Sequence, residues 1–212
     1  NYYKNCYVDL KESCLRSETT VKVFDQMRKL QSYTDEGSPG RDWNVATGMV
    51  IEGKAGFQIM GDWAKGEFTA AGKVPGVDYY CAATPSNNGY LYNVDSFIFY
   101  KSSDPDKQAG QQLLAKLMMG KNFQKVFNLY KGSIPARLDV SMDEFDKCAK
   151  TSNADIKTAG AKGGLVPSFA HGMAQGNTMK AALQDIITEH FNSDMSSVDA
   201  ANALADSVLA NM

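Results

Sequence analysis

The order of short apolar runs and amphipathic segments is the feature that most limits how this chain can fold. Before Ser103, short runs rich in apolar or β-forming residues alternate with helical segments, and after Ser103 helical segments dominate. The runs at residues 55–60, 79–83 and 91–100 are predicted to be strands. Such an alternation predicts an α/β fold, in which helices pack in layers against a sheet.

Helices are predicted where apolar residues recur at three- and four-residue steps. Ser17 and Asp42 are suitable N-cap residues, and Asp104 is followed by Pro105, a favoured first helical residue. Ser141 and Glu144 have capping-box spacing, which predicts a helix that starts there. The predicted helices cover residues 17–33, 42–52, 63–71, 104–119, 122–130, a segment from 141, 177–191 and a segment from 197. In the last one, Val198, Ala201, Leu204 and Val208 are expected to face inward.

The composition is that of an ordinary globular protein. Of the 212 residues, 43% are hydrophobic, and the formal net charge is −2. This charge argues against a nucleic-acid-binding protein, which usually carries a clustered basic excess. No run of 18 apolar residues exists that could span a membrane. Asn1 to Lys4 include neither an initiator Met nor a signal-peptide segment, so we expect a processed, truncated or partial chain.

The four cysteines are Cys6, Cys14, Cys81 and Cys148. They have no CxxC or CxxH spacing, so a zinc site is not predicted. Their even number suits two disulfides in an oxidising compartment, with a long-range bridge from Cys81 to Cys148 and a local one from Cys6 to Cys14. Four buried free thiols remain the alternative, and the sequence does not fix the pairing.

Five segments resemble, in order, motifs of the extracellular solute-binding proteins for sugars. The first, IEGKAGFQIMGDW at residues 51–63, matches a helix end, a strand, a glycine and a tryptophan that faces the ligand in that family. The others are YCAATP at 80–85, NVDSF at 93–97, KGSIPAR at 131–137 and PSFAH at 167–171. Together they cover nearly the whole chain, and they are most similar to the glucose/mannose-binding branch.

The resemblance implies an α/β fold of the periplasmic-binding-protein type II, or two-lobed Venus-flytrap, class. At most six strand segments are visible, too few for two complete lobes, so we expect this chain to be the C-terminal portion. Residues 1–88 and 143–212 would then belong to the C-terminal lobe, and residues 89–142 would supply a hinge strand and a returning segment of the N-terminal lobe.

The resemblance also implies a function. We expect a periplasmic protein that binds a monosaccharide, with glucose first and mannose or galactose as alternatives, and delivers it to an ABC importer. Its partners would be the membrane permease subunits, a chemoreceptor and the missing N-terminal segment of the same protein. No cofactor and no nucleic acid are expected.

A hexose has apolar C–H faces and a rim of hydroxyls, so its site needs aromatic plates and polar groups. The resemblance implies that Trp43 and Trp63 face the sugar, although both could be core residues. Asp95, in an apolar run, would accept from two hydroxyls, or else face solvent at a strand end. Lys131 would donate to hydroxyl oxygens, or only complement a helix dipole. The remaining candidates are Asn93, beside Asp95, and His171, in a loop where a surface histidine is the alternative; His190, on a helix, is expected to be solvated.

Competing functions are a carbohydrate-active enzyme and a binding protein for another solute. Asp62 and Asp95 are the only acids in suggestive positions for glycoside hydrolysis, and Asp62 more simply caps the following helix. The sequence has no GxSxG, HExxH or P-loop motif, so no catalytic or metal-ligating residue is predicted. A disaccharide, a polyol or a non-sugar ligand remains open, because fold alone does not choose the ligand.

Overall fold

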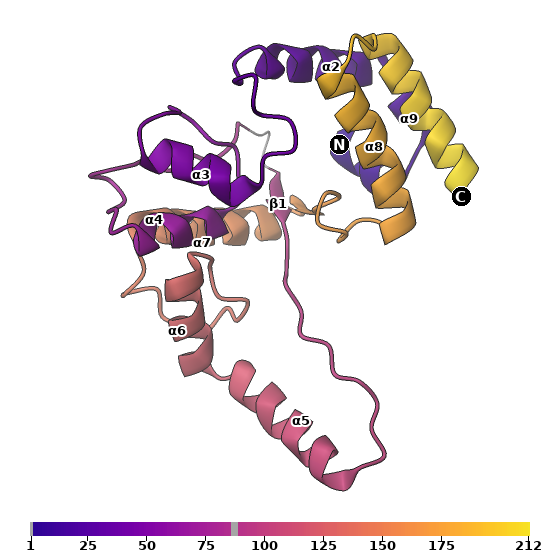
Figure 1. Ribbon diagram of the computed structural model, residues 1–212. Coiled ribbons are helices and arrows are strands. Elements are labelled where there is room, and N and C mark those ends of the chain that lie inside the picture. The colour runs from indigo at the N-terminus through magenta and orange to yellow at the C-terminus, as the bar shows by residue number, and fades with distance from the viewer. Residues whose placement is uncertain (1, 86–88) are drawn as a thin grey trace. The chain divides into compact units, whose positions relative to one another are not determined.

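The computed structural model describes residues 2–85 and 89–212, which are mainly helical (Figure 1). The helices and strands, in chain order, are η1 (Lys4–Val8, a π-helix), α1 (Glu12–Leu15), α2 (Glu18–Gln31), α3 (Trp43–Ile51), η2 (Asp62–Ala64, a 3₁₀ helix), α4 (Lys65–Ala70), β1 (Tyr90–Tyr92), α5 (Pro105–Met118), α6 (Lys121–Lys131), α7 (Lys147–Ala161), β2 (Leu165–Pro167), α8 (Asn177–Asn192) and α9 (Ser197–Asn211). The chain divides into two compact units. Unit 1 comprises residues 1–40, 91–93 and 165–212, and unit 2 comprises residues 41–90 and 94–164.

Unit 1 is built on α2, α8 and α9, which lie together and share one apolar core (Figure 1). Leu183, Leu204 and Val208 are fully buried in it, beside Phe24 of α2. Arg16 joins the start of the unit to α9, because its guanidinium forms an ion pair with Asp206. The first and last parts of the chain therefore build this core together.

A small parallel pair of strands, β1 and β2, is the sheet among the described residues. The Ser168 amide donates to the Tyr92 carbonyl at 2.9 Å, just after β2 ends. Tyr3 adds a side-chain link at the same place: its hydroxyl donates to the Pro167 carbonyl at 3.1 Å and accepts from the Phe169 amide at 2.7 Å. The loop after β2 is thereby fixed to the first turn of the chain.

Unit 2 contains α3, α4, α6 and α7. Lys65 of α4 is buried, and its ammonium donates to the Asp146 carboxylate at 2.7 Å. Because an unpaired buried charge is costly, this ion pair ties α4 to the segment that begins α7. The stacked rings of Phe68 and Tyr79, 4.1 Å apart, add an apolar contact.

Both disulfides that the sequence suggested are present, one in each unit. Cys6 is bonded to Cys14, 8 residues along the chain in unit 1. Cys81 is bonded to Cys148, 67 residues along the chain in unit 2. The alternative of four free thiols is therefore wrong.

Most predicted helices are confirmed, with boundaries within a few residues. Ser17 caps α2 by accepting from the Thr20 amide, and Asp104 caps α5 by accepting from the Asp106 amide. The predicted helix start at Ser141 is wrong. The Ser141 hydroxyl donates to Asp143 instead, and α7 begins at Lys147, with Asp146 as the cap that accepts from the Ala149 amide at 2.8 Å.

The strand predictions at residues 55–60, 79–83 and 93–100 are wrong, and only the start of the third run is a strand. Phe57 is 97% exposed and Ile98 is 78% exposed. A strand needs a hydrogen-bonded neighbouring strand. Among residues 2–85 and 89–212 these runs have no such neighbour, and Tyr79 forms only an isolated bridge with Pro75. In this described part of the chain, the expected α/β layering thus reduces to helices with one small sheet.

Two predictions about individual side chains are also wrong. Val198 was expected to face inward and is 55% exposed, whereas Ala201, Leu204 and Val208 of the same helix are buried as predicted. His190 was expected to be solvated and is fully buried, with its ring 4.8 Å from that of Phe24. The core of unit 1 therefore extends to the C-terminal end of α8.

Candidate functional site

Trp63 is the middle residue of η2, which follows the extended Gly61 and leads directly into α4. Its ring folds back over Gly61: a Cβ atom added to Gly61 would lie 2.1 Å from the Trp63 ring. No side chain fits at that distance, so glycine is required for this position of the indole. The glycine of the GDW sequence therefore permits the observed direction of the tryptophan.

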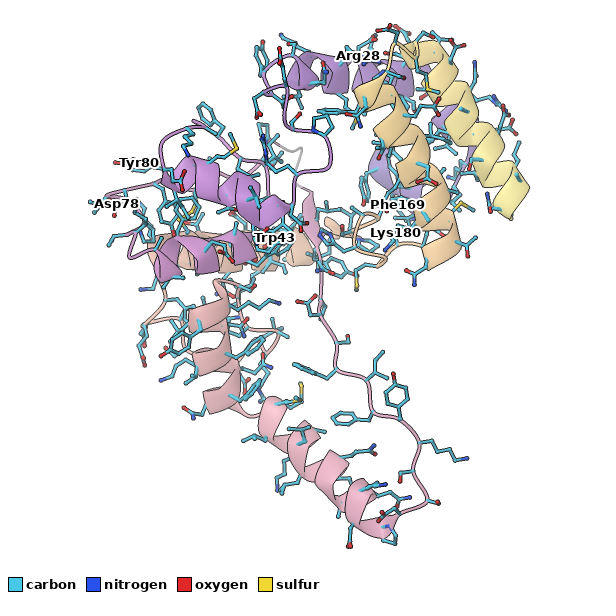
Figure 2. The ribbon with its side chains drawn as sticks, viewed as in Figure 1. Arg28, Trp43, Asp78, Tyr80, Phe169 and Lys180 are labelled. Atoms are coloured by element: carbon cyan, nitrogen blue, oxygen red, sulfur yellow. A yellow bond between two sulfur atoms is a disulfide. The ribbon has the colours of Figure 1, made fainter. Side chains whose placement is uncertain are left out.

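Trp43, labelled in Figure 2, is the first residue of α3. The residue is 39% exposed. The Trp43 carbonyl accepts from the Thr47 hydroxyl and from the Gln58 side-chain amide, both at 2.9 Å. The Thr47 hydroxyl also lies 2.8 Å from the Gln58 amide oxygen. The segment that leads to Trp63 is thereby attached to the helix turn that carries Trp43.

Asp95 and Lys131 form an ion pair in unit 2. Lys131 is the last residue of α6, and its ammonium lies 5.8 Å from the centre of the Phe127 ring. The Asp95 side chain is 62% exposed, so solvent reaches the carboxylate. Two of the predicted sugar-binding residues, 36 positions apart in the chain, therefore meet.

Asp62 faces the loop that follows Lys131. Burial raises the pKa of the Asp62 carboxyl, while the charge of Lys65, the Ile134 amide, the charge of Lys131 and the Ser133 hydroxyl all act to lower it. The prediction that Asp62 caps the following helix is wrong, because Gly61 is the N-cap of η2 and Ala64 that of α4, neither with a side-chain cap hydrogen bond. Asp62 lies instead opposite residues 133 and 134. The loop at 131–137 was recognised in the sequence, but nothing in the sequence paired it with Asp62.

His171 and Asn93 belong to unit 1. The Ser168 hydroxyl and the His171 ring atom Nδ1 are 2.7 Å apart, which fixes the imidazole against the turn after β2. Asn93 directly follows β1. Trp43, Trp63, Asp95 and Lys131 belong to unit 2, so the six predicted residues are divided between the two units. Asp95 and Lys131 are in contact, and the ligand-binding roles of all six stay predictions.

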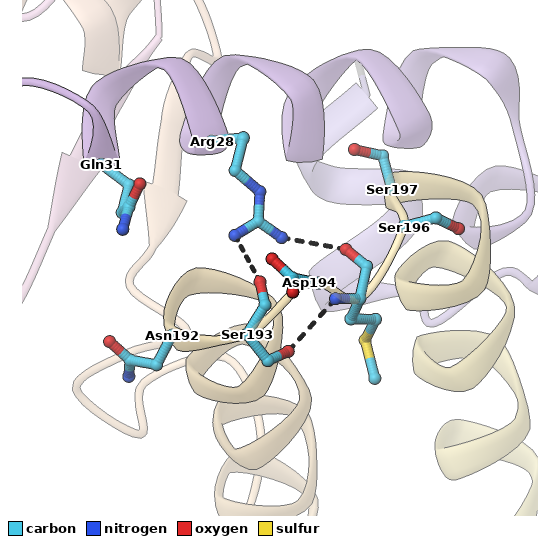
Figure 3. A pocket seen from close by; sticks show the side chains of 8 residues that line it. Arg28, Gln31, Asn192, Ser193, Asp194, Ser196 and Ser197 are labelled. Atoms are coloured by element: carbon cyan, nitrogen blue, oxygen red, sulfur yellow. Dashed lines mark hydrogen bonds between the residues drawn. The ribbon is translucent and has the colours of Figure 1, made fainter.

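Two surface depressions were candidates for a site outside the predicted set. One, of about 530 Å³, lies on α6 and is lined by Phe123, Val126, Phe127, Tyr130 and Lys131. The other, of about 540 Å³, lies between α2 and the α8–α9 turn (Figure 3). There Arg28 donates to the carbonyls of Ser193, at 2.6 Å, and Met195, at 2.9 Å. Arg28 thus serves to hold the turn, whereas the depression on α6 continues to Lys131.

Residues 2–85 and 89–212 contain no group of three or more His, Cys, Asp or Glu side chains arranged to hold a metal ion. In the same residues, no helix combines the length and apolar character needed to cross a bilayer.

Comparison with known proteins gives one family and several relatives. Residues 6–182 match the family described as bacterial extracellular solute-binding protein. A relative from Brucella suis named "Probable sugar-binding periplasmic protein" is 46% identical over 98% of this chain and 49% of its own length. An "Uncharacterized ABC transporter extracellular-binding protein" from Pyrococcus horikoshii is 34% identical over 81% of this chain and 38% of its own.

A more distant relative is named for its ligands. The "Xylose/arabinose-binding protein" of Haloferax volcanii is 26% identical over 89% of this chain and 40% of its own length. The chain spans about half the length of the curated relatives that it matches most strongly.

Proposed function

Because this chain belongs to the bacterial extracellular solute-binding protein family, we propose that it forms part of a periplasmic receptor that binds a monosaccharide and delivers it to an ABC importer. Glucose is the first candidate, with mannose and galactose next. The permease subunits of the importer, and a chemoreceptor, would be its macromolecular partners. The names of the bacterial relatives support a sugar ligand in the periplasm, and the family supports binding without catalysis.

The Asp95–Lys131 ion pair is the observation that carries the proposal. A carboxylate accepts from sugar hydroxyls and an ammonium donates to them, so a pair held at one place can engage two neighbouring hydroxyls. Both side chains reach solvent, and the Trp63 segment contacts the end of α6 through α4. An aromatic plate beside such a pair suits a pyranose, whose C–H face packs on the ring.

In the proposed receptor, residues 1–88 and 143–212 belong to one lobe, and residues 89–142 supply a hinge strand and a returning segment of the other. Trp43, Trp63 and His171 would contact the sugar from one lobe, and Asp95, Lys131 and Asn93 from the other lobe or the hinge. For Lys131 the close backbone approach of α6 to α4 favours the hinge, because α4 directly follows the helical turn that contains Trp63. A sugar that contacts both lobes stabilises the closed form by its higher affinity for that form.

The exposed apolar segments indicate what completes the receptor. Phe57 in the segment after α3, and Phe97, Ile98 and Tyr100 before α5, are all more than half exposed, and so are Leu113 and Leu117 on α5. Large apolar patches of this kind mark contact surfaces. Because the relatives are about twice as long as the matched region, we propose that polypeptide equivalent to their other half covers these segments as neighbouring strands and helices.

Isothermal titration with D-glucose tests the proposal. The chain would be titrated alone and after co-expression with the half of the Brucella suis relative that lies outside the match. At least one preparation is expected to release or absorb heat on binding a monosaccharide. If neither preparation shows heat of binding with glucose, mannose or galactose, the proposal is overturned.

A Trp63→Ala variant tests the site itself. Truncation of a buried aromatic contact is expected to weaken glucose binding by about 2 kcal/mol or more, roughly a 30-fold rise in Kd. Tyr33→Ala is the matched control, because Tyr33 is an exposed aromatic residue outside the predicted set. Equal affinities for the two variants would remove Trp63 from the site.

The alternative is a binding protein of the same family for another solute. The relative named for xylose and arabinose favours including pentoses in the titration series, together with a disaccharide and a polyol. A carbohydrate-active enzyme is tested separately with a chromogenic glucoside, for which no turnover is expected.

A further inference from the structure

Two glycines bring the Trp63 segment and the Lys131 segment into direct backbone contact. A Cβ atom added to Gly66 of α4 would lie 2.9 Å from the Lys131 carbonyl oxygen and 3.3 Å from that of Tyr130. A Cβ atom added to Gly132 would lie 2.6 Å from the Gly66 nitrogen and 3.0 Å from Lys65 Cβ. The first turn of α4 therefore rests on the C-terminal end of α6 with no side chain between them.

Gly132 has a second reason to be glycine. It ends α6 in the left-handed conformation, with φ of +86°, and its amide donates to the Asn128 carbonyl at 2.9 Å. L-residues with side chains rarely adopt this backbone conformation. Gly66, in contrast, has ordinary helical geometry, so contact with α6 is what requires glycine there.

The contact lies between two proposed ligand residues. Trp63 precedes Gly66 by three residues in the continuous helical stretch formed by η2 and α4, and Lys131 directly precedes Gly132. The Lys65–Asp146 ion pair, at 2.7 Å, also holds this turn of α4. A change in the spacing between α4 and α6 must therefore change the position of the Trp63 ring relative to the Lys131 ammonium.

We infer that Gly66 is a positioning residue for sugar binding, which sets the separation between the Trp63 ring and the Lys131 ammonium through its backbone contact with α6. The inference rests on the proposed function. Gly66 has no side chain and therefore no polar or aromatic group that could contact a sugar. Its expected effect on sugar affinity acts only through the positions of Trp63 and Lys131.

The test compares Gly66→Ala with Gly48→Ala in whichever preparation binds glucose. Gly48 is also helical, within α3 of the same unit, but a Cβ atom there would meet nothing within 4 Å. Both substitutions favour the helix locally by about 1 kcal/mol, so they are matched in propensity. Gly66→Ala is expected to raise the Kd for glucose about fivefold or more, and Gly48→Ala less than about twofold, because packed backbones accommodate an added carbon only by moving apart.

A second measurement separates positioning from general destabilisation. The Gly66→Ala change is repeated in a Lys131→Gln background, and ligand-observed NMR measures the weak binding of glucose. In that background Gly66→Ala is expected to raise the Kd less than about twofold, because the effects of coupled residues are not additive. An undiminished effect in that background, or equal Kd values for the two alanine variants, would overturn the inference. Failure of the unmodified protein to bind any monosaccharide would instead overturn the proposed function.

Discussion

Removal of the Cys81–Cys148 disulfide should destabilise unit 2 without affecting unit 1. The bond joins residues 67 positions apart, and both lie in unit 2. In the chain-entropy treatment, a loop of this length is worth about 4.4 kcal/mol, from an entropy of about 2.1 + 1.5R ln n cal/mol/K at 25 °C. The Cys6–Cys14 bond closes 8 positions in unit 1 and is worth about 2.5 kcal/mol by the same relation.

The two tryptophans make the measurement specific to one unit. Trp43 and Trp63 are the only tryptophans in the sequence, and both lie in unit 2. Tryptophan emission during urea unfolding should therefore follow unit 2, and far-UV circular dichroism should follow the helices of both units. A double variant, Cys81→Ala with Cys148→Ala, is expected to shift the emission midpoint to markedly lower urea.

The control is the corresponding double variant at Cys6 and Cys14. It is expected to leave the emission midpoint unchanged and to shift to lower urea the part of the circular dichroism transition that tryptophan emission does not follow, which reports the helices of unit 1. The reasoning would be refuted if the control shifted tryptophan emission as much as the Cys81/Cys148 variant. It would also be refuted if the latter lost less than about 1 kcal/mol, since the loop closure would then contribute far less than its length implies.

Two further outcomes are expected in unit 1. Leu204→Ala should lower the free energy of unfolding by about 2–5 kcal/mol, because Leu204 is fully buried. Leu209→Ala, on the exposed side of the same helix, should lower it by less than about 1 kcal/mol. Denaturant unfolding of the two variants measures both values. Burial and the nearby charge of Arg28 lower the pKa of His190, against the opposing charge of Asp25. Because the folded state disfavours the imidazolium, the free energy of unfolding should be constant above about pH 7 and fall as the pH drops below about 6.5. This loss at low pH should be smaller in His190→Gln. An identical pH dependence in that variant would show that His190 does not cause the loss.

Helices were predictable because their signals are local. Ser17 and Asp104 cap α2 and α5 through hydrogen bonds to amides two or three residues away, so the information lies within one turn of chain. The helix start predicted at Ser141 was wrong although its signal was also local. The Ser141 hydroxyl donates to Asp143, and Asp146 is the N-cap of α7. Sequence spacing could not decide between two acceptable caps a few residues apart.

Strands were less predictable because pairing is not local. The run around Phe57 has the composition of a buried strand, but no neighbouring strand is available to it in the described part of the chain. The prediction that His190 is solvated was wrong for a related reason. Its burial depends on Phe24, which lies far away in sequence on α2. The composition of a segment indicates which secondary structure and burial are possible for it, and the neighbouring segments in the fold determine which of these form.

The candidate site was predictable as a set of residues but not as an arrangement. The resemblance drew attention to Asp95 and Lys131 separately, and only the fold brings them into an ion pair. Gly66 carried no signal at all, since a glycine in a short helix is usually unremarked. Its contact with the Lys131 carbonyl depends on how α4 and α6 pack.

The interleaved composition of unit 1 has a consequence for biosynthesis. Helix α2 packs on α9, so the first core helices must wait for residues 165–212 before they can be buried. Unit 2 has all of its internal contacts available once Gly164 has entered the compartment in which the chain folds. If the chain enters that compartment N-terminus first, unit 2 can form before unit 1, because α1 and α2 stay exposed until α9 follows.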